Sequence, residues 1–187
     1  EGGNWREDAQ ARALALGDVS AFTTTVDPDR LRSGASDPPI TDPGFYNRIF
    51  RSRQDLGEGV GGSFPQYRGR WQPYGLWIPR GYDPASPAPL VLVLHSLNVH
   101  HNQYAGSNLY RHLGDGLGAL AVTPLARGPD GWYWNEALVD TLEVWADVRA
   151  HYAVDGERTY VTGYSMGGYG TWRLTTLMPD RFAGAVS

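Results

Sequence analysis

The chain contains no cysteine among its 187 residues. This absence excludes a thiol nucleophile, a thiolate metal site and any disulfide within the chain. It leaves the cellular compartment open, because many secreted proteins also lack disulfides. Of the possible locations, we expect a secreted or extracellular one rather than a cytoplasmic one.

A long apolar run is also missing. A membrane-spanning helix needs about 20 consecutive apolar residues, whereas the longest aliphatic run is Leu90–Leu94. We therefore expect no membrane partner. The first residues, Glu1–Asn4, lack the basic start and the apolar stretch of a signal peptide. Because the chain does not begin with Met, we expect processing or truncation at its front.

Basic charge is scarce as well. The net charge is −4 and the sequence pI is about 5.7, whereas a protein that binds phosphate backbones needs a basic surface. Nucleic acid is therefore not an expected partner. Arg48, Arg51 and Arg53 lie close together in sequence, and we expect them to form a solvated surface.

From residue 74 onward, apolar runs alternate with segments of helical periodicity. The expected strands are Tyr74–Ile78, Leu90–Leu94, Ala119–Thr123, Thr159–Thr162 and Phe182–Val186. The expected helices are Tyr104–Leu113, Asn135–Tyr152 and Met166–Leu177. A continuous aliphatic run such as Leu90–Leu94 is typical of a strand buried on both faces. The pattern predicts an α/β fold, with a mostly parallel sheet and helices on both faces.

The first part of the chain has a weaker pattern. We expect a short helix over residues 5–17, a strand over 22–26 and a loop over 27–45. Residues 57–62 match G-x-G-x-x-G, but they lack the preceding strand and following helix of a dinucleotide site, so a linker is expected. The expected domains are an N-terminal extension of unknown role, 1–65, and the N-terminal part of a catalytic domain, 66–187.

The chemistry is indicated by Gly163-Tyr164-Ser165-Met166-Gly167, which fits G-x-S-x-G. A predicted strand runs into this motif and a predicted helix follows it, which is the context of a nucleophile elbow. Ser165 is therefore the candidate nucleophile, in a strained conformation with its hydroxyl exposed. The N–H of Met166, at the helix N-terminus, is the natural first oxyanion donor. The alternative is a serine that only caps the helix.

A second oxyanion donor is expected in the turn after the strand Leu90–Leu94. His95-Ser96 resembles the His-Gly pair that ends this strand in many α/β-hydrolase esterases, with serine in place of glycine. The resemblance implies that the backbone N–H of Leu97 or Ser96 completes the oxyanion hole. It also implies that His95 is a structural residue and not the catalytic base.

The resemblance extends over about residues 74 to 187. It includes Asp130–Asn135, Val154-Asp155, Arg158 and the elbow with its double glycine, Gly167-Gly168. These segments resemble the polyhydroxybutyrate-depolymerase, feruloyl-esterase and prolyl-oligopeptidase-like branch of the α/β-hydrolase superfamily. Asp155 could be the acid of a triad, but the resemblance implies that it belongs to a structural turn, where Asp is favoured. We also expect a structural role for Asp140, which precedes the nucleophile on a helix.

The remaining members of a catalytic triad are not visible. In α/β-hydrolases the order along the chain is Ser, then Asp or Glu, then His. After Ser165 the sequence has one acidic residue, Asp180, and no histidine. We therefore expect the domain to be cut at Ser187, with acid and base beyond it, and the chain alone to be a poor catalyst. The alternative is a base recruited from His100 or His101.

Neither a metal nor a cofactor is expected. His95, His100 and His101 could suggest zinc, which needs about three protein ligands of suitable geometry. The adjacent histidines would point to opposite faces of an extended segment, and no acidic residue lies near them in sequence. We interpret them as polar loop residues.

The substrate is suggested by Trp132, Tyr133 and Trp134, which lie in a loop at the carboxyl side of the predicted sheet. They could bind an aryl or polymeric acyl group, or they could cap the core. We expect a serine hydrolase that cleaves small-molecule or polymeric carboxylic esters through an acyl-serine intermediate. A prolyl-oligopeptidase-like peptidase and a non-catalytic binding module remain open. A histidine downstream of Ser187 in the full gene would distinguish an enzyme from a binding module.

Overall fold

The structure, a computed structural model, describes residues 16–17, 28–33, 39–61 and 66–187. These residues fall into two compact units, one that ends at Ile40 and one that begins at Thr41. The first unit contains helix α2 (Pro28–Ser33), where the sequence predicted a loop. The strand expected over 22–26, and all but the end of the helix expected over 5–17, lie outside the described residues.

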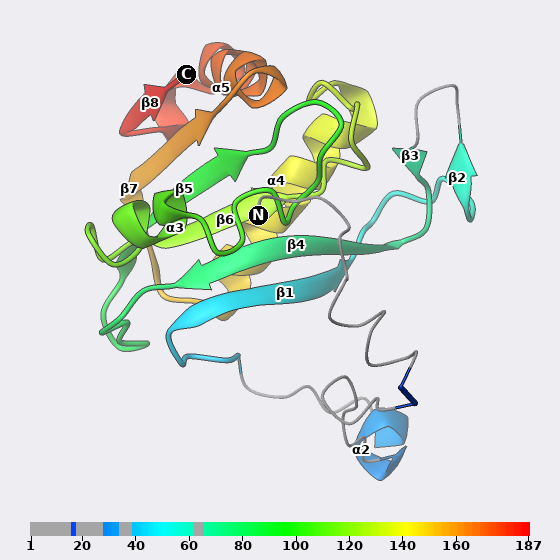
Figure 1. Ribbon diagram of the computed structural model, residues 1–187, viewed down its shortest axis with the longest axis horizontal. Helices are drawn as coiled ribbons and strands as arrows, with labels where there is room; N and C mark the ends of the chain where they lie inside the picture. Colours follow the sequence, from blue (N-terminus) through cyan, green and yellow to red (C-terminus); the bar gives the residue numbers. More distant parts are fainter. Residues whose placement is uncertain (1–15, 18–27, 34–38, 62–65) are drawn as a thin grey trace. The chain divides into compact units, whose positions relative to one another are not determined.

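The second unit is built on a six-stranded sheet with the order β1-β4-β6-β5-β7-β8 (Figure 1). Its strands are β1 (Gly44–Arg51), β4 (Trp71–Ile78), β5 (Ala88–Leu94), β6 (Leu120–Pro124), β7 (Val154–Gly163) and β8 (Gly184–Val186). Strands β5, β6, β7 and β8 pair in parallel, whereas β1 and β4 are antiparallel to their neighbours. A short hairpin of β2 (Val60–Gly61) and β3 (Gln66–Tyr67) stands apart from this sheet.

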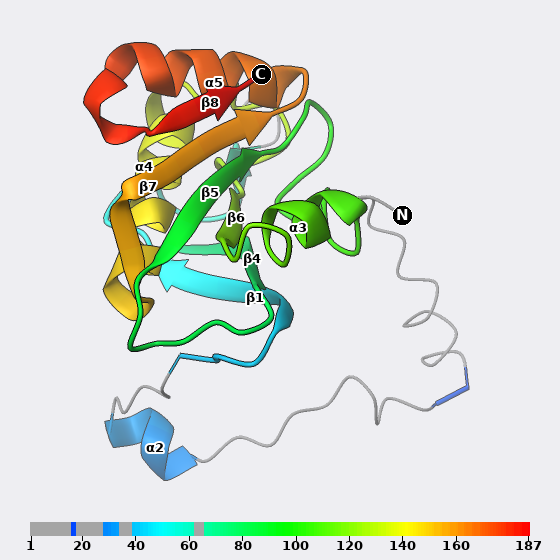
Figure 2. The same cartoon turned by 90° about the vertical axis from the view of Figure 1, so that its left-hand side faces the viewer.

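Helices cover both faces of the sheet. They are α3 (Asn108–Leu113), α4 (Asn135–His151), α5 (Met166–Leu177) and the 3-10 turn η2 (Pro179–Arg181). Figure 2 shows α3 on one side of the sheet, with α4 and α5 on the other. The connection from β5 to β6 runs in one direction along the sheet, and the connections from β6 to β7 and β8 run in the other. Because such crossovers are right-handed, connections of opposite direction place their helices on opposite faces.

Strand β5 explains why the core has two layers. Its side chains alternate, with Val91 and Val93 in the cluster beneath α3 and Leu90, Leu92 and Leu94 in the larger cluster beneath α4 and α5. All five are buried, and each buried Leu or Val contributes roughly 1.5–3 kcal/mol. The continuous aliphatic run is therefore a strand covered on both faces, as expected. No helix among the described residues has the length and apolar character needed to cross a membrane.

The compact unit begins before the domain boundary expected at residues 65 and 66. Residues 44–51 form β1, which pairs with β4 along its whole length, from Gly44↔Ile78 to Arg51↔Trp71. The sequence pattern missed this strand because an edge strand of an antiparallel pair has only part of its surface buried. The structure therefore includes residues 41–61 in the unit that holds the sheet.

Arg48 also differs from the solvated surface residue expected. Its guanidinium donates to the hydroxyls of Tyr74 (2.9 Å) and Tyr152 (3.0 Å), so it joins β1 to β4 and to the end of α4. The Tyr74 hydroxyl in turn donates to a carboxylate oxygen of Asp147 at 2.6 Å. Arg51 and Arg53 are exposed, as expected.

A second arginine, Arg127, is buried and connects several segments of the chain. Its side chain is fully buried and donates to the carbonyl oxygens of residues 67–69 at 3.0–3.3 Å. It also donates to the Ser52 hydroxyl at 2.5 Å, and Ser52 donates to Glu143 of α4. The arginine therefore ties the chain on either side of the β2–β3 hairpin to α4.

The charge of Arg127 is balanced by Asp140, which is also fully buried on α4. The Arg127 Nε and Asp140 Oδ1 atoms are 3.6 Å apart. Burial raises the pKa of the Asp140 carboxyl, and the charge of Arg127 opposes this rise. Asp140 is thus a partner of a structural arginine, in agreement with the structural role expected for it.

Removing this carboxylate should destabilise the fold. Asp140→Ala leaves a buried guanidinium without its counter-ion, and breaking a buried pair in this way costs about 3–5 kcal/mol. Thermal unfolding should show a clear fall in Tm. Asp180→Ala is the control, because its carboxylate is exposed and lies 3.9 Å from an exposed Arg181, and it should leave Tm nearly unchanged. Equal Tm values for the two variants would contradict this account.

Candidate active site

Ser165 stands at the junction between β7 and α5. The strand ends at Gly163 and the helix begins at Met166, so the chain turns within two residues. Ser165 has φ 57° and ψ −117°, and its side chain is exposed. The strained backbone expected at Ser165 is confirmed by this positive φ. Its side chain makes no capping hydrogen bond to the helix, which argues against the alternative in which Ser165 only caps α5.

Glycines on either side of Ser165 allow this turn. A Cβ on Gly163 would collide with the backbone of Gly167, and a Cβ on Gly167 would collide with the carbonyl oxygen of Leu94. The helix therefore starts in direct contact with the end of β5. Only glycine permits such a close approach of backbone to backbone, which is the physical reason for the small residues of the motif.

The first turn of α5 offers a free donor next to Ser165. The Gly167 N–H donates to the Tyr164 carbonyl (2.9 Å), and the Tyr169 N–H donates to the Ser165 carbonyl (3.0 Å). Within the part of the chain that the structure describes, the N–H of Met166 has no hydrogen-bond partner. An unpaired N–H at a helix N-terminus favours negative charge.

The loop after β5 lies beside this turn. The hydroxyl of Ser96 donates to the Tyr164 carbonyl oxygen at 3.0 Å, which joins the loop to the residue before Ser165. The Ser96 N–H, one of the two donors expected for an oxyanion, already donates to Gln103 Oε1 at 2.7 Å. The Asn98 N–H donates to the Pro129 carbonyl. Among the described residues, the Leu97 N–H between them has no partner, so the Leu97 amide is available as a donor, whereas the Ser96 amide is already paired.

His95 is a structural residue in this arrangement. Its ring is fully buried, and its two ring nitrogens lie 2.9 Å from the carbonyl oxygens of Ser96 and Leu125. Burial lowers the pKa of His95, and the hydrogen bonds to the two carbonyl oxygens oppose this shift. Both nitrogens face the backbone, which leaves neither directed at Ser165.

His100 and His101 lie in a loop, as expected, but both are buried. The loop that holds them packs on β4, where a Cβ on Gly75 would collide with the His101 carbonyl oxygen at 2.7 Å. Burial, together with the neighbouring histidines, lowers the pKa of His101 to about 3, which makes it a weak base. The described residues contain no group of three or more potential metal ligands.

The three aromatic residues after β6 separate into two roles. Trp132 and Trp134 are 39% and 47% exposed, whereas Tyr133 is fully buried. The Tyr133 hydroxyl donates to the His95 carbonyl at 2.9 Å, and a Cβ on Gly170 would collide with the Tyr133 ring. Tyr133 was expected to bind substrate, but it has no exposed surface with which to do so. It packs the loop against β5 and α5.

Trp132 and Trp134 form an aromatic cluster with Tyr169 of α5. The ring centroids of Trp132 and Tyr169 are 5.5 Å apart, and those of Trp134 and Tyr169 are 6.2 Å apart. The guanidinium of Arg173 lies 3.4 Å from the Trp134 ring centroid and donates to the Tyr133 carbonyl. Tyr169 was not predicted from the sequence, although its position four residues after Ser165 places both on one side of the first helical turn.

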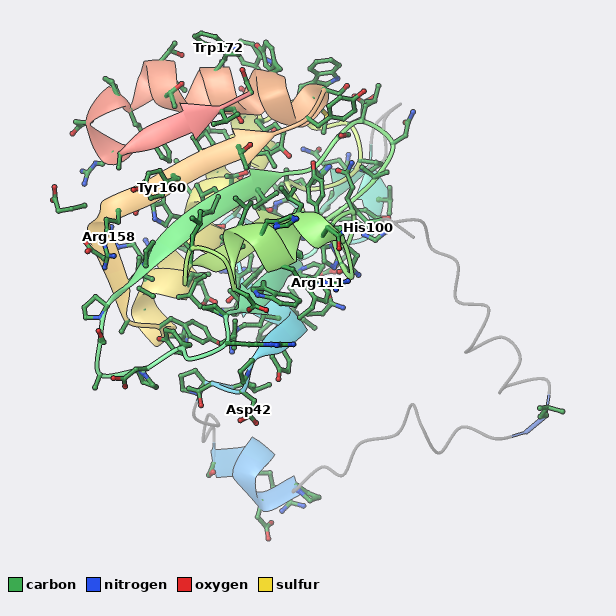
Figure 3. The ribbon with its side chains drawn as sticks, turned by 60° about the vertical axis from the view of Figure 1, so that its left-hand side comes forward. Asp42, His100, Arg111, Arg158, Tyr160 and Trp172 are labelled. Carbon is green, nitrogen blue, oxygen red and sulfur yellow. The ribbon has the colours of Figure 1, made fainter. Side chains whose placement is uncertain are left out.

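Two further residues, Asp155 and Trp172, lie away from this site. Asp155 lies within β7 rather than in the turn expected, and its pair with Arg158 at 2.7 Å fits a structural role. Figure 3 shows Arg158 at the opposite end of the sheet from His100, and Trp172 on the outer side of α5.

Two surface grooves of the unit lie away from Ser165. One lies between β1 and α4 and is lined by Phe50 and Leu142 among others. Another lies between α3, β7 and β8 and is lined by Leu113 and Tyr160 among others.

The contact between Gly167 and β5 makes a testable prediction. Gly167→Ala inserts a methyl group against the Leu94 carbonyl, and such overpacking costs about 1–3 kcal/mol. Gly168→Ala is the matched control, because its Cβ would lie 3.3 Å from the Gly163 carbonyl oxygen and alanine favours a helix by about 1 kcal/mol over glycine. Thermal unfolding should show a lower Tm for the Gly167 variant only. A Gly167 variant as stable as the control would show that the turn is looser than described.

Comparisons with known proteins identify the fold. No protein-family model matches the chain, and no curated protein matches it. Solved structures do match, among them FphF, a fluorophosphonate-binding serine hydrolase of Staphylococcus aureus, with 19% identity and a TM-score of 0.61 over 77% of this chain and 56% of that one.

An S-formylglutathione hydrolase from Agrobacterium tumefaciens matches with 19% identity and a TM-score of 0.59, over 81% of this chain and 59% of its own. A feruloyl esterase module from Clostridium thermocellum, in complex with sinapinate, matches with 16% identity and a TM-score of 0.58, over 80% and 54%. The chain thus spans little more than half the length of these three proteins. Identities at this level show the fold, and the chain contains part of an α/β-hydrolase fold, as the sequence predicted.

Proposed function

We propose that the protein is a serine hydrolase that cleaves carboxylic esters through an acyl-serine intermediate, with Ser165 as its nucleophile. One observation carries the proposal: an exposed serine with positive φ, at a strand–helix junction, that makes no capping bond to the helix behind it. A strained conformation of this kind is retained where the surrounding structure enforces it, as at nucleophiles.

The amides near Ser165 suggest how the reaction proceeds. Ser165 Oγ attacks the ester carbonyl carbon while a base takes the hydroxyl proton, and the carbonyl oxygen becomes an oxyanion. The N–H groups of Met166 and Leu97 are the proposed donors to this oxyanion. Collapse of the intermediate expels the alcohol, which takes up the proton, and water then releases the acid from the serine by the same steps.

The base is proposed to come from a part of the protein other than this chain. His95 and His101 are buried and their pKa values are lowered, and one ring nitrogen of His100 accepts from the Asn102 N–H within its own loop. His151 ends α4 at the edge where β7 begins, which is the edge opposite Ser165. The solved structures with this fold are longer than the present chain, which leaves room for a base and for the acid that orients it.

The proposed substrate site is the aromatic cluster, with Trp132 and Trp134 as the residues that contact the acyl group. Both follow β6, whose carboxyl end lies at the same edge of the sheet as those of β5 and β7. Aromatic faces bind aryl groups and extended apolar chains, so either a small-molecule or a polymeric ester fits. Tyr133 is not included, because it is buried.

Replacement of Ser165 tests the proposed nucleophile in the protein that carries this chain. Ser165→Ala should lower kcat for a simple aryl ester by roughly 10⁴-fold or more and should abolish labelling by a fluorophosphonate. Ser86→Ala is the control, because Ser86 is exposed in a turn between β4 and β5, and it should change neither.

The results distinguish an esterase with Ser165 as nucleophile from the alternative functions. Labelling that survives in Ser165→Ala would reject Ser165 as the nucleophile. A whole protein that neither hydrolyses the ester nor reacts with the phosphonate would support a binding module instead. Faster cleavage of a peptide anilide than of the ester would favour a peptidase.

The aromatic cluster makes a prediction about substrate size. Trp134→Ala should lower kcat/KM for a bulky aryl-acyl ester by about 3- to 10-fold more than for an acetyl ester, since an aromatic contact contributes about 0.5–1.5 kcal/mol. Trp172→Ala is the matched control, because Trp172 is 63% exposed on the outer side of α5, and it should leave this ratio unchanged. Equal loss on both esters, with a lower Tm, would mean that Trp134 only covers the core.

A further inference from the structure

One side chain of the loop after β5 bonds back to the start of that loop. The carboxamide of Gln103 makes two hydrogen bonds to the same residue, Ser96: its Oε1 accepts from the Ser96 N–H at 2.7 Å and its Nε2 donates to Ser96 Oγ at 3.0 Å. Only this orientation of the amide is possible, because the reverse one would set two donors against each other at the backbone N–H.

The second of these bonds continues to the residue before Ser165. A serine hydroxyl has one proton, and that of Ser96 is donated to the Tyr164 carbonyl oxygen at 3.0 Å. The hydrogen bonds therefore run in one direction, from Gln103 Nε2 to Ser96 Oγ to the Tyr164 carbonyl. That carbonyl belongs to the peptide bond that joins Tyr164 to Ser165.

The same loop is anchored to β5 at a second point. The Tyr104 hydroxyl donates to the carbonyl oxygen of Leu94 at 3.2 Å, and a Cβ on Gly167 would collide with that same oxygen. Gln103 and Tyr104 thus fix the loop both to the last residue of β5 and to the turn that holds Ser165. Ser96 itself is only 7% exposed, so its bonds are shielded from water.

These bonds determine which amide of the loop is free. The Ser96 N–H is occupied by Gln103, and the Asn98 N–H is occupied by the Pro129 carbonyl. Among the residues described, the Leu97 N–H is left without a partner between two peptide groups that are each held in place. A donor held in this way needs little reorganisation when charge develops on a substrate oxygen.

We propose that Gln103 is a positioning residue that, through Ser96, fixes the Leu97 N–H relative to Ser165. The inference rests on the proposed function of Ser165 and adds a residue outside the G-x-S-x-G motif to it. The hydroxyl of Ser96 is needed, because it alone connects the Gln103 amide to the Tyr164 carbonyl. Loss of one oxyanion donor costs about 10²- to 10³-fold in kcat, and a displaced donor costs a fraction of this.

The Gln103→Glu substitution gives the sharpest test. An ionised carboxylate can still accept from the Ser96 N–H, but it cannot donate to Ser96 Oγ, so the Ser96 hydroxyl turns away from Tyr164. A protonated carboxyl has the same donor and acceptor as the amide. We expect kcat for an aryl ester to fall about 10- to 100-fold at neutral pH, with KM changed less than about threefold.

The pH dependence distinguishes positioning from a general structural effect. The ratio of variant to parent kcat, taken at each pH, should recover as the pH falls through the pKa of the introduced carboxyl. Asn108→Asp is the matched control, because it makes the same change of amide to acid at an exposed position on α3, and its ratio should stay near one at every pH.

A mutant cycle gives a second measurement. Ser96→Ala and Gln103→Leu should each lower kcat, and the double variant should lose little more than the larger single loss, because both break the same chain of bonds. Additive losses, or a Gln103→Glu variant with unchanged kcat and unchanged labelling by a fluorophosphonate, would overturn the inference while Ser165 remains the nucleophile. A parent protein without turnover or labelling would overturn both proposals.

Discussion

The register between the parallel strands β5 and β7 determines how the loops around Ser165 are arranged, at the edge of the sheet where these strands end. Strands β5 and β7 pair from Leu90↔Thr159 to Leu94↔Gly163, so they end at the same level. Their loops then begin side by side, and residue 96 of one meets residue 164 of the other. A shift of this register by one residue would reverse the faces of every side chain in β7. The site therefore depends on core packing in the middle of the sheet.

Backbone strain is concentrated at the same edge. The described non-glycine residues with positive φ are Asn98, Ala126, Arg127, Trp132, Tyr133, Asn135 and Ser165. All of them follow the carboxyl ends of β5, β6 or β7. Such conformations cost of order 1–3 kcal/mol each and persist only where surrounding contacts enforce them. Here those contacts include the buried rings of Tyr133 and His95 and the buried guanidinium of Arg127.

The sequence predicted the parts of the fold in which one strong pattern dominates. The helix Met166–Leu177 was predicted with the bounds that the structure has, because a glycine-rich turn precedes it and Pro179 follows it. Strand β5 was recognisable from its aliphatic run. In contrast, β1 mixes exposed and buried positions and depends on its pairing with β4, a contact that no local pattern reveals.

The candidate site was predictable only in part, for a related reason. Ser165 and Met166 lie within a motif whose spacing encodes its turn. Whether Tyr133 is buried, or whether the Ser96 N–H is already paired, depends on side chains from other segments, such as Gly170 and Gln103. Arg48 looked like a surface residue for the same reason, since Tyr74 and Tyr152, which bind it, are distant in sequence.

The bonds of Arg127 bear on the order in which the molecule assembles. They join residues separated by 58 to 75 positions along the chain, and the ion pair to Asp140 closes a further loop across the first turns of α4. Contacts between such distant residues carry a large loop-closure entropy, so they form late in folding. Interactions that are absent from the folding transition state slow unfolding more than they speed folding. We infer that the contacts of Arg127 slow the unfolding of the protein and so lengthen the lifetime of the folded state.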